Sequence, residues 1–202
     1  MSAYLWSGLS RAVLKHVNHW RGRVVFIHIN KTGGTSIERA LHLRSERLSA
    51  REKRARLGER PWQRAFKFAF VRNPWDKVVS HYHYRVRTGK AGFDDDHPPF
   101  GDWVRLAYRD RNPRYYDVPL MFASQLEWVA DREGHVLVDF IGRFERLDED
   151  FAEVCRHIGV RAELPRVKTT SHAHYRDFYD DETRAIVARL FAPDLERFGY
   201  RF

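Results

Sequence analysis

A short polar segment near the start of the chain contains residue types that can hold an anion. In NKTGGTS, residues 30–36, Lys31 stands before two adjacent glycines, and Thr35 and Ser36 follow where a helix is expected to begin. Glycines let the main chain approach a ligand closely, and unpaired N–H groups at a helix start favour an anion. A lysine and hydroxyl groups add to such a nest of donors. The segment therefore predicts a phosphate or sulfate cradle formed by Lys31, Thr32, Gly33, Gly34, Thr35 and Ser36.

Apolar segments precede this turn and a second one. Val24–Ile29 is an apolar block of buried-strand type, and the phenylalanine-rich Ala65–Val71 is another. Each leads through a polar turn into a helical pattern, and in the second case Asn73 suits an N-cap with Pro74 at the first helical position. Strand, turn and helix thus occur twice. The pattern predicts an α/β fold: a single P-loop-like domain with a central parallel sheet flanked by helices.

The second half of the chain adds further elements. Val136–Ile141 is expected to form a third strand, followed by a helix that Asp148 would help to cap. The last expected helix buries one apolar face against the domain. Cys155, the one cysteine, lies among apolar neighbours and is expected to be a small core residue, not a nucleophile. The expected buried residues of the last helix are Ile186, Val187, Leu190 and Phe191.

Composition limits the class of protein. The chain has 202 residues, 43% of them hydrophobic and 31% charged, which suits one globular domain rather than a disordered chain. The formal net charge is +9. Nine Lys/Arg against three Asp/Glu lie between Arg44 and Lys67. This basic segment is expected to be a solvated helix, or alternatively a rim that attracts an acidic substrate.

The first 22 residues are set apart from the domain. We expect residues 1–22 to be a helical N-terminal extension and residues 23–202 to be the single globular domain. The extension has no continuous apolar segment of signal-peptide type, and no apolar run approaches the ~20 residues of a membrane-spanning helix. An amphipathic helix there would lie on the domain or on a membrane surface. A cytoplasmic, possibly membrane-peripheral, location is the expectation.

The cradle is not a Walker A loop. That motif places its lysine after the glycines, whereas Lys31 precedes both. Taken alone, the glycines are also consistent with a tight turn that has no ligand.

Several segments in order along the chain resemble one family. FIHINKTGGTS is similar to the 5′-phosphosulfate loop of sulfotransferases that use 3′-phosphoadenosine 5′-phosphosulfate (PAPS), and FKFAFVRNPWDKVVSHYHY to their 3′-phosphate element. Three further segments resemble the same family: SQLEWV, VDFIGRFERLDEDF and the C-terminal DDETRAIVARLFAPDLERFGYRF. The resemblance runs from about Val24 to the C-terminus and is to the carbohydrate-type branch, sulfotransferase family 2, which includes many bacterial members. It implies sulfuryl transfer from PAPS, without a metal, to a hydroxyl group of a carbohydrate or another acceptor.

The resemblance also implies a role for individual residues. Lys31 would bridge the 5′-phosphate and the transferring sulfuryl group, within the cradle of residues 32–36. Arg72 and Ser80 would hold the 3′-phosphate. An arginine fork with a hydroxyl suits a phosphate dianion, and a serine two helical turns after Arg72 can reach the same group. Lys31 is then expected to stabilise the leaving group.

The general base for the acceptor hydroxyl is less defined. Histidine has a suitable pKa, and we predict His81 and His83, which follow Ser80, as the catalytic candidates. Two residues apart on a helix, they point in different directions and are poor metal co-ligands. Two departures from relatives are Arg47, at a position that usually holds histidine, and Asn30, where proline is usual and a looser turn is expected. Other candidates are His28, His42, His172 and His174, with Glu46 and Glu52 less favoured.

Some aromatic and late residues have less specific interpretations. Trp75 and Trp128 are expected in the core, and Trp103 is the preferred aromatic contact for a sugar acceptor. Two interpretations are open for Lys168, His174 and Tyr175: they contribute to nucleotide or acceptor binding, or they belong to a solvated loop.

Two other functions remain as alternatives. One is a non-catalytic polyanion or nucleic-acid binder that uses the Arg44–Lys67 segment, although no nucleic acid is expected for the main hypothesis. The other is an ATP-dependent P-loop-like kinase, which the displaced Lys31 and the absence of an evident Mg²⁺-binding aspartate after an apolar strand disfavour. Acceptor identity and oligomeric state are not determined by the sequence.

Overall fold

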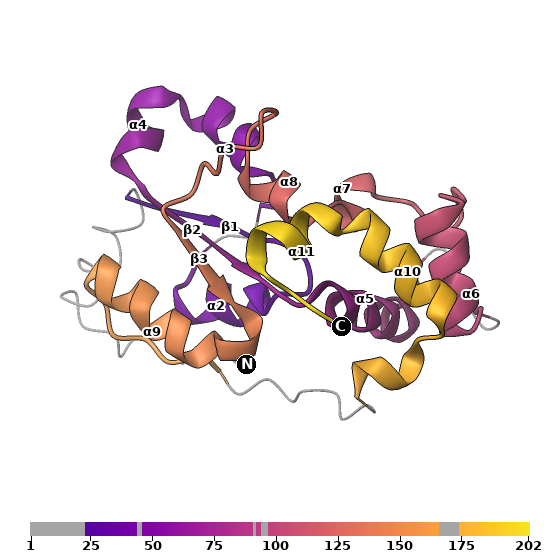
Figure 1. Cartoon of the computed structure of the whole chain (residues 1–202). Coiled ribbons are helices and arrows are strands. Elements are labelled where there is room, and N and C mark those ends of the chain that lie inside the picture. The colour runs from indigo at the N-terminus through magenta and orange to yellow at the C-terminus, as the bar shows by residue number, and fades with distance from the viewer. Residues whose placement is uncertain (1–22, 44–45, 91, 94–96, 166–173) are drawn as a thin grey trace, which may run out of the picture.

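Three parallel strands form the centre of the domain. Figure 1 shows the computed structural model, which describes residues 23–43, 46–90, 92–93, 97–165 and 174–202. The strands are β1 (Val24–Ile27), β2 (Phe66–Val71) and β3 (Phe140–Arg143), in the order β1-β2-β3. The register pairs Val24 with Phe66 and Phe68 with Phe140. The predicted α/β fold with a parallel sheet flanked by helices is therefore confirmed.

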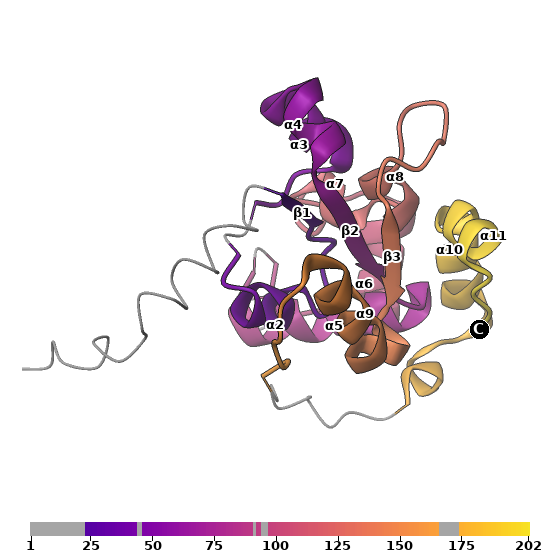
Figure 2. The ribbon, with the colours of Figure 1, turned by 90° about the vertical axis from the view of Figure 1, so that its left-hand side faces the viewer.

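Helices cover both faces of this sheet and extend beyond its carboxyl edge. Figure 2, turned by 90°, shows α2 and α9 on one side of the strands and α11 on the other. The helices of the described chain are α2 (Gly34–Ala40), α3 (Ala50–Leu57), α4 (Glu59–Arg64), α5 (Pro74–Thr88), α6 (Phe100–Val104), α7 (Pro119–Phe122), α8 (Gln125–Val129), α9 (Leu147–Ile158), α10 (Asp181–Leu190) and α11 (Ala192–Phe198), with shorter helical turns η1 (Arg105–Arg109), η2 (Phe144–Arg146) and η3 (Tyr175–Phe178).

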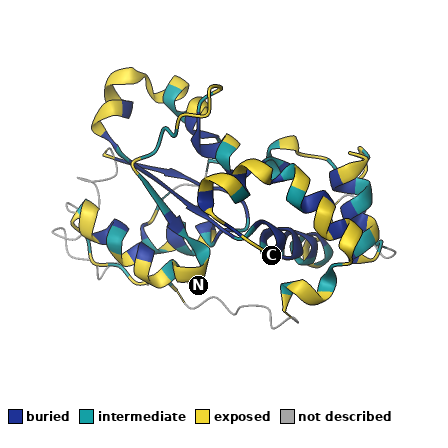
Figure 3. Ribbon diagram, viewed as in Figure 1, coloured by how far each residue is buried: buried dark blue, intermediate teal, exposed yellow. Residues whose placement is uncertain are grey.

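The two faces of the strands form two separate cores because successive side chains alternate across a sheet. Phe68 and Phe70 pack with Ile37 of α2 and Phe151 of α9. The other face, with Ala69 and Val71 of β2, packs against α3, α4, α8 and α11. In Figure 3, β1 and nearly all of β2 are buried, whereas β3 is mostly of intermediate burial.

A third core lies beyond the carboxyl edge of the strands. Val78, Val79 and Tyr82 of α5 pack against Trp103 of α6 and against α10 and its C-cap Phe191. Of the predicted buried residues in the last helix, Ile186, Val187 and Phe191 are buried and Leu190 is half-buried. Because α5 starts at the end of β2, this core fixes the helix that follows the second polar turn.

Several local predictions are confirmed. The Asn73 side chain accepts hydrogen bonds from the N–H groups of Trp75 and Asp76, and Pro74 occupies the first turn of α5. Cys155 is buried beside Phe151. Trp75 and Trp128 are core residues, 4% and 0% exposed.

Three local predictions were wrong. The third strand is Phe140–Arg143 rather than Val136–Ile141, because Val136 instead forms an isolated antiparallel bridge with Ala130. Asp148 does not cap α9, whose N-cap residue, Arg146, makes no side-chain capping bond. Trp103 is completely buried and therefore cannot contact an acceptor.

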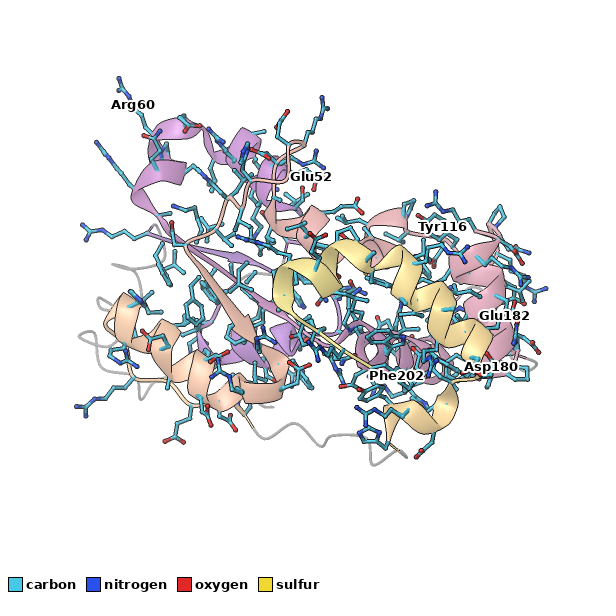
Figure 4. The ribbon with its side chains drawn as sticks, in the orientation of Figure 1. Glu52, Arg60, Tyr116, Asp180, Glu182 and Phe202 are labelled. Atoms are coloured by element: carbon cyan, nitrogen blue, oxygen red, sulfur yellow. The ribbon has the colours of Figure 1, made fainter. Side chains whose placement is uncertain are left out.

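The basic segment forms α3 and α4, which project from one end of the sheet (Figure 1). Most of its charged side chains are exposed, and Figure 4 shows Arg60 directed away from the domain. Lys67 is an exception: it is buried and pairs with Asp139 at 2.9 Å. In the part of the chain that the structure describes, no helix has both the length and the apolar character to cross a membrane.

Candidate functional site

The turn after β1 has an unusual backbone. Lys31 has φ 67° and Gly33 has φ 82°, both in the left-handed region. A side-chain-bearing residue is uncommon there, and such strain costs about 1–3 kcal/mol and gathers at functional sites. Ser36 and Ile37 then donate their N–H groups to the Gly33 carbonyl at 3.0 and 3.3 Å, which starts α2. The predicted cradle is therefore a strained turn between a buried strand and a helix.

Gly34 has no room for a side chain. A Cβ at this position would overlap the ring of His28. The His28 ring is buried and is held by Glu38, whose Oε1 lies 2.6 Å from Nδ1. Burial lowers the pKa of His28, and the Glu38 carboxylate opposes that shift. The ring consequently fills the space behind the cradle and fixes the requirement for glycine.

The other cradle residues differ in exposure. Thr32 is completely buried, and its hydroxyl donates to the Ile29 carbonyl at 3.0 Å. Thr35 is exposed and Ser36 is half-buried. The Thr32 side chain thus stabilises the turn, while the hydroxyl groups of Thr35 and Ser36 are more accessible.

Asn30 also ties the turn to the rest of the domain. It is 3% exposed, and its Nδ2 donates to the Met121 carbonyl of α7 at 3.1 Å. Where a looser turn was expected from the replacement of proline, the asparagine adds a tertiary hydrogen bond.

Lys31 is half-buried beside an aromatic ring. Its Nζ lies 4.5 Å from the centroid of the Tyr84 ring on α5. Burial, together with the neighbouring charges of Arg87, Arg72 and Arg47, lowers the pKa of Lys31 to about 8. A cluster of positive charge therefore surrounds the cradle.

Arg72 directly follows β2 and reaches the cradle. Its Nε donates to Asp76 Oδ2 at 2.8 Å, and its Nη1 donates to the Lys31 carbonyl at 3.1 Å. The guanidinium carbon lies 4.0 Å from the centroid of the Phe144 ring. At 7% exposure, Arg72 has little freedom to move. One side chain thus joins the turns after β1 and β2.

Ser80 belongs to the same face of α5. It is half-buried and lies four residues after Asp76 and four before Tyr84, a spacing that places side chains on one face of a helix. Asp76 contacts Arg72, and Tyr84 contacts Lys31. The structure therefore brings Lys31, Arg72 and Ser80 to one region.

The two predicted histidines lie in different surroundings. His81 is 4% exposed, its Nδ1 is 3.3 Å from the Tyr108 hydroxyl, and its ring packs against Trp103. Burial holds the pKa of His81 well below its ordinary value, and the charges of Lys77, Arg85, Lys31 and Arg47 contribute. The His83 ring packs against Phe178 of η3. The two histidines therefore point to different parts of the third core.

The remaining candidates have separate surroundings. Glu52 accepts the backbone and hydroxyl donors of Ser49 in a capping box, and Glu46 pairs with Arg56 at 3.0 Å. His42 is exposed after α2, and His174 is the N-cap of η3. Lys168 and His172 lie outside the described residues.

Arg47, in the place of the usual histidine, is exposed. Its Nη1 lies 3.6 Å from the Met121 sulfur, and its charge lowers the pKa of both Lys31 and His81. Tyr175, the third member of the late group, lies within 3.5 Å of Asn73 Nδ2 through its hydroxyl. Among the described residues, no group of three or more His, Cys, Asp or Glu side chains could hold a metal ion.

Sequence reasoning gave no role to Gln125, Asp194, Tyr84 or Phe144. Gln125 and Asp194 are completely buried, but each lies in a short helix that also carries exposed charged residues, so the surrounding sequence gives no signal of their burial. The helical spacing of Tyr84 from Ser80 is the signal that could have identified Tyr84.

The comparisons with known proteins show the family to which the chain belongs. The model of the sulfotransferase family matches residues 19–201, so the chain belongs to the sulfotransferase family. Membership indicates an enzyme that transfers a sulfuryl group from a sulfate donor to an acceptor.

Two similar proteins give further context. An uncharacterized protein of Archaeoglobus fulgidus is 37% identical over 126 residues, which is 61% of this chain and 92% of that protein. A crystal structure of a sulfotransferase from Alicyclobacillus acidocaldarius aligns with a TM-score of 0.40 and 17% identity, over 96% of this chain and 94% of that one.

Proposed function

We propose that this sulfotransferase uses PAPS as its donor and transfers the sulfuryl group to a hydroxyl of a carbohydrate. The main support is the hydrogen bond from Arg72 to the Lys31 carbonyl, which joins the two turns at the carboxyl edge of the sheet. Ligands of open α/β sheets bind at this edge. A donor with phosphate groups at both its 5′ and 3′ positions requires two such anion sites close together.

The residues of the first turn suit the 5′-phosphosulfate. Glycine at position 34 keeps the main chain free of a Cβ, and Gly33 supplies a left-handed turn. The N–H groups of residues 32–35, with the hydroxyls of Thr35 and Ser36, would surround the anion. Lys31 would neutralise the charge that develops on the leaving oxygen.

Arg72 and Ser80 would hold the 3′-phosphate. Arg72 already uses Nε and Nη1 for protein acceptors, so Nη2 is the part of the fork that would face the ligand. A charge-assisted hydrogen bond from this nitrogen would be supplemented by the Ser80 hydroxyl. Asp76 and Phe144 would keep the guanidinium in place before the ligand arrives.

The proton of the acceptor hydroxyl would pass to one of the two predicted histidines, His81 or His83. His81 is 4% exposed and packs against Trp103 in the third core, whereas His83 is half-buried. Burial holds the pKa of His81 well below its ordinary value, so its ring is neutral near pH 7. Comparing kcat of His81→Asn and His83→Asn identifies the base, and an unchanged kcat in both variants would exclude the pair.

Calorimetric titration with nucleotides tests the donor. We expect 3′-phosphoadenosine 5′-phosphate (PAP), the product nucleotide, to bind more tightly than ATP, and we expect Lys31→Ala to weaken that binding. Lys90→Ala, which removes an exposed lysine, should leave it unchanged. Binding of ATP without binding of PAP would overturn the proposal in favour of a kinase.

A further inference from the structure

Gln125 holds the main chain of Arg72 from both sides. Its Oε1 accepts the Arg72 N–H at 2.8 Å, and its Nε2 donates to the Arg72 carbonyl at 2.8 Å. The last paired residue of β2 is Val71, opposite Arg143 of β3. Gln125, completely buried, therefore continues the pairing of β2 for one residue beyond the sheet.

Asp194 of α11 in turn holds Gln125. Its Oδ2 accepts the Gln125 N–H at 2.8 Å and lies 3.2 Å from Gln125 Nε2, and its Oδ1 accepts the Leu126 N–H at 2.9 Å. Asp194 is completely buried, and burial raises its pKa. Three donors thus converge on one carboxylate from the C-terminal helix.

Lys77 of α5 supplies the charge that faces this carboxylate. It is 1% exposed, and its Nζ has no hydrogen-bond partner among the described residues. The Lys77 and Asp194 charges nevertheless act on each other's pKa. A buried carboxylate is costly unless it is hydrogen-bonded and compensated, and Asp194 has both forms of stabilisation.

We propose that Gln125 and Asp194 are positioning residues that set the enzyme's affinity for the donor's 3′-phosphate by fixing the backbone of Arg72. The inference rests on the proposed function. A rigidly held arginine binds an anion with less loss of conformational freedom than a mobile one. The C-terminal helix α11 would thereby determine selectivity for a 3′-phosphorylated nucleotide, although none of its residues would contact the ligand.

The test compares two ligands that differ by one phosphate group. PAP and adenosine 5′-phosphate would share the cradle, but PAP alone would reach Arg72. We expect Gln125→Met, which keeps the side-chain length and removes both bonds to Arg72, to reduce the affinity for PAP about tenfold. The affinity for adenosine 5′-phosphate should change less than about twofold, so the selectivity ratio falls.

Asp139→Asn is the matched control. Asp139 accepts the Lys67 N–H at 2.7 Å and so holds the opposite end of β2. This variant should lower thermal stability without changing the ratio of the two affinities. Donor kinetics provide a second measurement: Gln125→Met should raise KM for PAPS while kcat changes little.

Asp194→Asn provides the same test with a smaller change, should Gln125→Met fail to fold. It keeps one acceptor oxygen, and we expect a smaller loss of selectivity in the same direction. Wild-type selectivity in whichever of these variants folds would overturn the inference. If the wild-type protein itself does not prefer PAP to adenosine 5′-phosphate, the assignment of Arg72 to a 3′-phosphate fails instead.

Discussion

The turns after β1 and β2 are adjacent but are built differently. The first depends on its own backbone: left-handed angles at Lys31 and Gly33, and a glycine at position 34 against the His28 ring. The second depends on side chains from elsewhere in the chain, since Gln125 and Phe144 both contact Arg72. A change in the first turn should therefore act locally and strongly, whereas the second should respond to substitutions remote in sequence.

The largest effect on PAP affinity is expected for Gly34→Ala. The added Cβ would overlap the His28 ring, and such overpacking costs about 1–3 kcal/mol of folding stability. Because the strain is relieved by moving the main chain that would hold the anion, we also expect PAP affinity to fall by roughly tenfold or more. Calorimetry with PAP measures this loss. Gly101→Ala is the control, because the nearest atom there is the end of the flexible Arg105 side chain, 3.0 Å from the added Cβ.

A double variant sharpens this prediction. His28→Ala combined with Gly34→Ala removes the ring that the new methyl group would meet, so part of the affinity should return. Wild-type affinity in the single Gly34→Ala variant would show that the cradle is not confined as described.

Arg72→Lys should have the next largest effect. Lysine retains the charge but cannot donate to Asp76 and Lys31 together with a phosphate in one planar fork. We expect about a tenfold loss of PAP affinity, as for one charge-assisted hydrogen bond. Arg105→Lys is a suitable comparison, because Arg105 forms a similar fork to Asp180 and Glu182 near the start of α10 (Figure 4). Equal losses in both variants would count against a local role for Arg72.

The affinity for PAP should also fall at alkaline pH. The lowered pKa of Lys31 is about 8 in the free protein, and an anionic ligand binds the protonated form. The affinity for PAP is therefore highest well below pH 8 and falls as the pH rises through 8, by about fivefold between pH 8 and pH 9. Lys31→Arg, which stays charged, should bind with a flat profile in this range. An unchanged decline in that variant would assign the titration to another group.

The smallest effect is expected at the cap of α5. Asn73→Ala removes the side-chain acceptor for Trp75 and Asp76, and the loss of such a cap costs about 1 kcal/mol of the free energy of unfolding. Urea denaturation measures this change. Ser49→Ala, at the N-cap of α3, should have a similar effect on stability, but only Asn73→Ala should weaken PAP binding. Equal PAP affinity in the two variants would show that the N-cap of α5 does not support the binding site.

The difference between the two turns, one built from its own backbone and one held by distant side chains, explains how much the sequence could predict. The paired glycines, the Asn73–Pro74 start of α5 and the first two apolar strands are local patterns, and each gave the correct element. Gln125 contacts Arg72, 53 positions away along the chain, and Asp194, 69 positions away. No local pattern encodes such contacts.

The wrong predictions for Trp103 and for the third strand also depend on contacts between residues distant in sequence. Trp103 was expected at the ligand because it follows a loop rich in glycine and aspartate, yet α6 turns it into the third core. The Val136–Ile141 segment has strand character, but only its end lies beside β2, where Phe140 pairs with Phe68. In both cases tertiary packing decided between options that the local sequence left open.

Sulfate transfer from labelled PAPS is the most direct test of the central claim. The protein would be incubated with the labelled donor and a panel of glycans, with lipids and small phenols as alternative acceptors. We predict that the wild-type protein passes the label to a carbohydrate and that Lys31→Ala lowers the rate by about 10²- to 10³-fold, as expected for loss of a group that stabilises transition-state charge. Transfer at the full rate in Lys31→Ala would contradict the account.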